Sequence, residues 1–230
     1  MKIPNRKVLE RDIVKVISDI RLYKTSNIDN HSSLVNKTLN LAVRRVVMKL
    51  REQGLSLGEF DHLYLNFTTL KPEGEIKLND STDSYHPWYR YCDIGTNTDD
   101  YEGLENADLS GSVLEQIKYV LLGLFDARDV IENAFLEAEK GPQMLMRFKQ
   151  KKSSKGAATV YLRLLDSGKY LPLLCVTDAA GNEILSADLP ETVDLSLIGE
   201  IQLNSKKVTI KPRKNALAKE LEPIAFDIKL

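Results

Sequence analysis

The chain has 230 residues and a formal net charge of −1, with 43% hydrophobic and 28% charged residues. These values are typical of a globular protein with a substantial core, and they exclude an extended disordered chain. No apolar run approaches the roughly 20 residues that cross a bilayer, and the opening MKIPNRKVLERDIVKV lacks the apolar core of a secretory signal. Because Cys92 and Cys175 lie far apart, we expect reduced thiols in a cytoplasmic protein with no membrane association.

The charges are segregated along the chain. Residues 1–53 carry twelve Lys/Arg against five Asp/Glu, whereas residues 61–109 carry three against eleven. Basic residues return in 140–170, with eight against one, and in 206–219, with six and no acid. A nucleic-acid binder needs a coherent positive face, which this alternation does not indicate. Folding that gathers the basic segments 140–170 and 206–219 on one side stays an alternative.

Two helices are predicted in the first quarter of the chain. Residues 7–24 place apolar residues at spacings of three and four, which indicates one apolar helical face. A second apolar stripe runs from Leu34 to Leu50, with Ser32 or Ser33 as its N-cap and Gly54 at its end.

Strands are predicted in the region that follows, His62–Asn97. Leu63, Leu65 and Phe67 alternate with polar or aromatic residues, a period of two that predicts a strand with one face in the core. The segment KPEGE predicts a turn, with a short returning strand at 76–78. The run YHPWYRYCDIG predicts another strand, which Pro87 restricts to a strand start or an edge. Residues 95–111 are rich in acids and predict an exposed loop.

The second half combines helix and strand patterns. Ser112 and Glu115 form a capping-box pattern that opens a helical segment reaching Gly141-Pro142, either as one helix or as two broken near Asp126. From Gln143 onward, short alternating runs separated by polar turns predict an antiparallel sheet or small barrel. The predicted fold class is therefore α+β: N-terminal helices with a short β region, a central helical segment and a C-terminal antiparallel sheet or small barrel. We expect an α+β domain over 1–140 and a β-rich domain over 141–230, either separate or packed into one unit.

Motifs for catalysis and cofactor binding are missing from the sequence. It contains no GxSxG, no HExxH and no GxGxxG. Cys92 with His62 or His86 is a conceivable nucleophile and base, but an inert thiol in a strand is the more common arrangement. Asp61 with Glu75-Ile-Lys77 is similar to the acid, acid-x-Lys arrangement of metal-dependent nucleases, although Glu-x-Lys triplets are common. We therefore expect no catalytic residues, no metal and no cofactor.

Recognition of a partner is the function class that the sequence favours. Seven of the sixteen Phe, Tyr and Trp residues lie between Phe60 and Tyr91. Aromatic anchors surrounded by carboxylates suit a basic protein partner. The candidate partner-binding residues are Tyr64, Trp88, Tyr89, Tyr91, Asp83, Asp93, Asp99, Asp100 and Glu102. The alternative is that some of these aromatic side chains fill the core and that the acids only solvate loops.

The stretches DHLYLNFTTL and WYRYCDIGTN resemble the central region of bacterial immunity proteins from polymorphic-toxin and contact-dependent inhibition systems. The resemblance covers residues 61–97 and implies a non-catalytic cytoplasmic protein. Such a protein would bind one cognate toxin and occlude a basic active-site cleft, for example that of a nuclease. Two alternatives stay open: a nucleic-acid-binding or metal-dependent nuclease-like protein, and a structural or assembly subunit.

Overall fold

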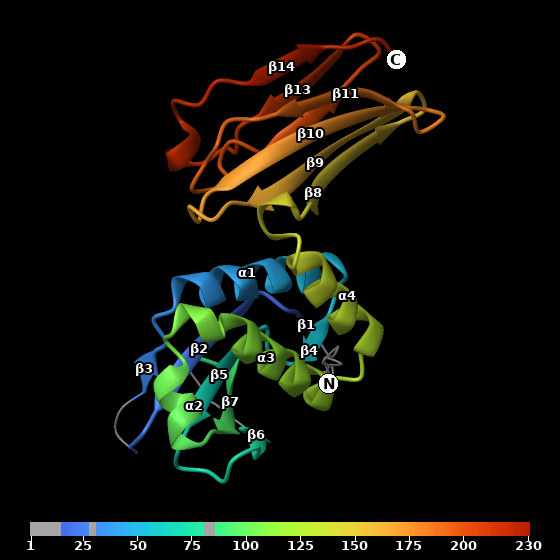
Figure 1. Cartoon of the computed structure of the whole chain (residues 1–230). Helices are drawn as coiled ribbons and strands as arrows, with labels where there is room; N and C mark the ends of the chain where they lie inside the picture. The colour runs from blue at the N-terminus through green and yellow to red at the C-terminus, as the bar shows by residue number, and fades with distance from the viewer. Residues whose placement is uncertain (1–14, 28–30, 81–85) are drawn as a thin grey trace, which may run out of the picture. The chain divides into compact units, whose positions relative to one another are not determined.

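The computed structural model describes residues 15–27, 31–80 and 86–230, which divide into two compact units (Figure 1). The first unit comprises residues 1–36 and 53–128, and the second comprises residues 37–52 and 129–230. The helix at 37–52 therefore belongs to the same unit as the C-terminal half, although it lies early in the sequence.

A five-stranded mixed sheet forms the centre of the first unit. Its strands, in spatial order, are β3 (Ser32–Ser33), β2 (Asp19–Thr25), β5 (His62–Thr68), β7 (Tyr89–Gly95) and β6 (Ile76–Leu78). The three inner strands β2, β5 and β7 run parallel, and the short outer strands β3 and β6 pair with them antiparallel. Strands β1 (Lys15–Val16) and β4 (Ser56–Gly58) form a separate antiparallel pair.

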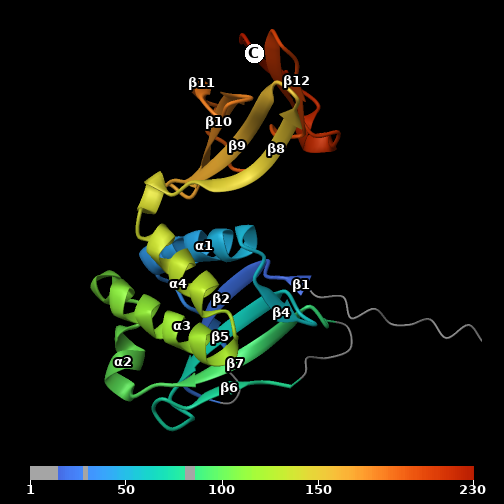
Figure 2. The same cartoon turned by 90° about the vertical axis from the view of Figure 1, so that its right-hand side faces the viewer.

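The two faces of this sheet differ in character. Leu63, Leu65 and Phe67 of β5 are fully buried on one face, and each such burial contributes roughly 1.5–3 kcal/mol. Helix α3 (Ser110–Leu124) lies on that side of the sheet, together with the shorter α2 (Thr98–Gly103) and the 3-10 turn η1 (Ala107–Leu109) (Figures 1 and 2). The other face carries the alternate residues, among them tyrosines, and no described helix of this unit lies on it (Figure 2).

A buried asparagine ties the strands to the helical layer of the first unit. Asn36 is only 4% exposed. Its amide nitrogen donates to the carbonyls of Leu104 and Asn106 and to the Ser110 hydroxyl, at 3.1–3.3 Å. These bonds fix the segment after β3 against the start of α3.

The second unit is built from two helices and two antiparallel sheets. Its helical elements are α1 (Lys37–Glu52), α4 (Arg128–Ala138) and the 3-10 turns η2 (Gly141–Gln143) and η3 (Ala216–Ala218). One sheet has the order β11-β10-β9-β8 and the other β12-β13-β14. The strand bounds are Met146–Ser153 (β8), Gly156–Leu164 (β9), Tyr170–Asp178 (β10), Glu183–Asp188 (β11), Glu200–Leu203 (β12), Lys207–Lys211 (β13) and Ile224–Asp227 (β14).

Arg45 links α1 to the four-stranded sheet. Its guanidinium donates twice to the Leu164 carbonyl, at 2.7 and 3.1 Å, and once to Asp166 at 2.6 Å. The Arg45 side chain is 8% exposed and that of Asp166 is 72% exposed. The buried charge is therefore satisfied mainly by a backbone carbonyl.

The predicted fold class, an α+β chain led by N-terminal helices, is wrong. Strands dominate, in four separate sheets, and the described residues contain four α-helices. The helix predicted over 7–24 falls partly outside the described residues, and its described part forms strands β1 and β2. Among the described helices, none is long and apolar enough to cross a membrane.

Several local predictions can be compared with the structure. The helix near 34–50, the strands around Leu65, Ile76 and Tyr91, the break near Asp126 and the C-terminal antiparallel strands are confirmed. Ser32 and Ser33 do not cap α1, because they pair with β2 as strand β3. The loop predicted over 95–111 contains α2, whose N-cap Asn97 accepts from the Asp100 amide at 2.9 Å. Helix α3 begins at Ser110, so the capping box at Ser112 is wrong.

Candidate functional site

Four tyrosines from the three parallel strands form one cluster on the sheet face away from α3. Tyr64 of β5 is opposite Tyr91 of β7 in the register, and Tyr23 of β2 and Tyr89 of β7 complete the set. The ring of Tyr64 stacks on that of Tyr89 with centroids 4.6 Å apart. It also lies 5.4 Å from Tyr23 and 5.3 Å from Tyr91. We name these four residues the tyrosine cluster.

The tyrosine cluster combines a buried centre with an accessible rim. Tyr64 is 8% exposed, whereas Tyr23, Tyr89 and Tyr91 are half-buried. Burial raises the pKa of Tyr64 and Tyr91, so their hydroxyls stay protonated at neutral pH. The Arg21 guanidinium carbon lies 5.4 Å from the Tyr64 ring centroid, within cation–π range. The rings therefore hold one another in place while presenting hydroxyls and ring edges to a partner.

Trp88 extends the aromatic surface at the start of β7. It is 39% exposed, and its ring lies edge-on to His86 at 4.9 Å and 6.4 Å from Tyr89. The Trp88 carbonyl accepts from the backbone N–H groups of Asp61 and His62, at 2.9 and 3.0 Å. An exposed indole on an anchored backbone loses little entropy on binding, which is a property of binding hot spots.

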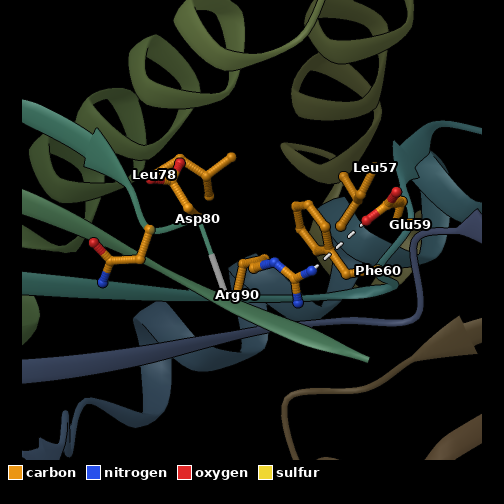
Figure 3. Close-up of a pocket in the computed structure, with 7 residues that line it drawn as sticks. Leu57, Glu59, Phe60, Leu78, Asp80 and Arg90 are labelled. Carbon is orange, nitrogen blue, oxygen red and sulfur yellow. Dashed lines mark ion pairs between the residues drawn. The ribbon is translucent and has the colours of Figure 1, made fainter. Parts of the chain in front are cut away.

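Arg90 supports the segment that carries Trp88 (Figure 3). Its guanidinium lies 5.4 Å from the Phe60 ring centroid and donates to the carbonyls of Pro87 at 3.3 Å and Tyr89 at 2.9 Å. Its Nη2 is 3.9 Å from Glu59 Oε2, the ion pair drawn in Figure 3. The cavity there, of about 280 Å³, is lined by Leu57, Glu59, Phe60, Leu78, Asn79, Asp80 and Arg90. The Arg90 guanidinium is thus engaged by two backbone carbonyls, a carboxylate and a ring, and its bonds to Pro87 and Tyr89 hold the backbone on both sides of Trp88.

The described acidic candidates occupy two different places. Asp93 of β7 lies on the same sheet face as the tyrosine cluster and accepts from Asn66 Nδ2 at 2.8 Å. Asp99, Asp100 and Glu102 are exposed on α2, where carboxylates in the first turn stabilise the helix end. Asp83 lies outside the described residues. The structure thus brings Asp93 together with the predicted aromatic residues and places the other described acids on a helix.

The fold does not bring together the residues of the metal-dependent nuclease site, or of the Cys92–His62 pair, that the sequence offers as alternatives. Asp61 lies beside Trp88, and Glu75 lies beside Gly95 at the other end of β7, which corresponds to roughly 20 Å at the usual strand rise. In the parts of the chain that the structure describes, no group of three His, Cys, Asp or Glu residues is arranged to hold a metal ion. Cys92 is fully buried on the helix-covered face, whereas His62 lies on the opposite face.

The basic segments lie in the second unit. Residues 140–170 include β8 and β9, and residues 206–219 include β13 and η3. Lys149 Nζ donates to the Gly199 carbonyl, while Lys151 and Lys152 are exposed near the end of β8. Lysines are common on outer strands, where they oppose unwanted strand pairing.

The sequence did not single out four residues that belong to this surface. Tyr23 completes the tyrosine cluster, and Thr25, His31 and Asn66 form a hydrogen-bonded group beside it. The alternation of Asp19, Arg21, Tyr23 and Thr25 is a strand signal that could have revealed the first two. Comparison of the chain with protein-family models, curated protein sequences and solved structures gives no match.

Proposed function

We propose that this chain is a cytosolic immunity protein that binds a cognate toxin domain through the tyrosine cluster and Trp88 and neutralises it without catalysis. The observation that carries the proposal is the tyrosine cluster itself. Parallel sheets are normally covered by apolar contacts on both faces, whereas here one face presents half-buried tyrosines. Tyrosine and tryptophan are enriched at protein interfaces because they give large contact areas with few rotatable bonds.

The charge of the surrounding chain supports a basic partner. Residues 53–128 contain fourteen Asp/Glu against five Lys/Arg. Opposite fields accelerate association, and aromatic anchors then slow dissociation. A toxin that cleaves nucleic acid has a basic cleft for phosphate, which the tyrosine cluster with Asp93 beside it can occlude. The resemblance of residues 61–97 to immunity proteins supports the toxin as the partner.

The direct test is protection by association. The chain should be co-expressed with the toxin domain encoded by a neighbouring gene, and cell survival and co-purification should be measured. We expect a stable complex and survival. Unimpaired killing together with no detectable association would contradict the proposal, and RNA binding with a steep salt dependence would favour the nucleic-acid alternative instead.

Trp88→Ala is the sharpest single variant of this test. Loss of the Trp88 indole should weaken the complex by about 2 kcal/mol or more, while the protein should stay folded because Trp88 is 39% exposed and lies outside the core. Tyr119→Ala is the matched control, since Tyr119 is an aromatic residue of α3 with 69% exposure, outside the tyrosine cluster. Titration calorimetry on both variants measures the difference. A folded Trp88→Ala protein with unchanged affinity would remove Trp88 from the interface.

A further inference from the structure

A second cavity lies where the parallel strands β2, β5 and β7 end. Its volume is about 280 Å³, and it is lined by Thr25, His31, Asn66, Thr68, Leu70, Lys71 and Asp93. In open sheets with parallel strands, ligands characteristically bind at the carboxyl ends of those strands. Three of the lining residues, Thr25, Asn66 and Thr68, are polar and only 2–3% exposed. A concave site in which a few polar side chains converge is the usual candidate for a binding site.

The hydrogen bonds in this cavity run in one direction. Thr25 Oγ1 donates its single proton to Asn66 Oδ1 at 2.8 Å. In its contact with His31 Nδ1, at 3.0 Å, the same oxygen is therefore the acceptor. Asn66 Nδ2 then donates to Asp93 Oδ1 at 2.8 Å. Each of these side chains is held by its neighbour, and the Asp93 carboxylate has a fixed orientation before any ligand arrives.

The chemistry of the cavity selects a cation. Asp93 Oδ2 accepts no hydrogen bond from the described residues, so a strong acceptor site remains available. Lys71, the one lysine or arginine in the lining, is paired with Glu75 at 3.2 Å. A phosphate or carboxylate would be repelled by Asp93, whereas an ammonium or guanidinium group gains a charge-assisted hydrogen bond.

The size and surroundings of the cavity match one long side chain. A volume of about 280 Å³ lies just below the range of small-molecule and cofactor sites. Leu70, 52% exposed, is available to cover an aliphatic stem at the entrance. The ring of Tyr91 lies 5.4 Å from that of His31, which joins the cavity to the tyrosine cluster. We propose that this cavity receives a lysine or arginine side chain of the protein partner, with Asp93 as the counter-ion; this inference rests on the proposed function.

Asp93→Asn tests the inference, because it removes the charge and keeps an oxygen that can accept from Asn66. We expect the affinity for the neighbouring toxin domain to fall about tenfold or more. The matched control is Asp100→Asn, which changes the net charge equally on α2, and it should alter the affinity less than threefold. In a double-mutant cycle, one lysine or arginine of the toxin should show coupling to Asp93 and none to Asp100. Equal affinities of the wild-type and Asp93→Asn proteins would overturn the inference and leave the proposed function standing.

A measurement without the toxin separates the two proposals. N-butylguanidinium can be titrated into the full chain while backbone amide NMR shifts are followed. We expect saturable shifts at Asn66 and Thr68 in the wild-type protein and their loss in Asp93→Asn. If the toxin does not associate but these shifts occur, the proposed function fails while the cation site stands. If neither Asn66 nor Thr68 responds, or if Asp93→Asn responds equally, the cation site is wrong.

Discussion

At the scale of single residues, the buried position of Cys92 determines how reactive its thiol is. It lies in β7 with no exposed surface, and burial together with the negative charge of Asp93 raises its pKa to about 12. At pH 7 only about one thiol in a hundred thousand is then the nucleophilic thiolate. Cys92 is therefore a small apolar core residue, whereas the next residue, Asp93, lies on the opposite face and lines the cavity at the ends of the parallel strands.

Among the glycines, Gly95 leaves the least room for a side chain. A Cβ built there lies 1.8 Å from the Pro72 carbonyl oxygen, because the end of β7 bonds through its N–H and C=O to the turn before β6. Gly95→Ala should lower the free energy of unfolding by about 2 kcal/mol or more, since backbone has to move. Denaturant unfolding measures this change.

Gly111→Ala is the control for that substitution. Gly111 lies in α3 with nothing within 4 Å of its Cβ position. Alanine should stabilise the helix by up to about 1 kcal/mol. Equal free energies of unfolding for the two alanine variants would show that the Pro72 carbonyl does not lie against Gly95.

At the scale of elements, sequence patterns predict the helices and strands whose apolar periodicity is unambiguous within a few residues. Strand β5 was predicted because Leu63, Leu65 and Phe67 alternate over seven residues, and α1 because its apolar stripe spans four turns. The segment that contains β2 was predicted as a helix, since its apolar residues also fit a spacing of three and four. Its true pairing is with β5, about forty residues later, and no local pattern contains that contact. Tyr64, Tyr89 and Tyr91 were consequently predicted as site residues, whereas Tyr23 and Thr25 were not.

The attachment of α1 to the four-stranded sheet gives a prediction for an element. Arg45→Ala should lower the free energy of unfolding by about 2–4 kcal/mol, because it leaves the Leu164 carbonyl without its donors and removes buried packing. Asp166→Ala should cost less than about 1 kcal/mol, since Asp166 is 72% exposed. Thermal unfolding of both variants gives the comparison. Equal losses would mean that the ion pair, and not the carbonyl, holds the helix.

At the scale of the whole molecule, the two compact units are interleaved in sequence. Helix α1 lies in sequence between two segments of the first unit but belongs to the second. The predicted domain boundary at 140/141 would therefore separate α1 from Leu164 and Asp166, the groups that satisfy Arg45. Two domains divided at 140/141 stay a prediction of the sequence. A cut at that boundary should destabilise α1.

A fragment that ends at residue 140 should unfold at a lower temperature than the full chain and should be cleaved by protease within residues 37–52. The physical reason is that α1 loses its contacts with the four-stranded sheet, and a helix with fewer tertiary contacts is less stable. Circular dichroism melting and mass spectrometry of the proteolysis products measure both effects. A fragment as stable as the full chain would show that the contacts of Arg45 contribute little to α1.

The outer strands of the five-stranded sheet have a consequence for how a partner can be recognised. β3 and β6 are only two and three residues long, so the sheet offers little backbone for strand addition by another chain. In the proposed complex, recognition on this unit would then depend on side chains that project from the sheet face. A surface of that kind can acquire a new specificity by exchanging a few residues, and the proposed pair of proteins would then diversify together without any change of fold.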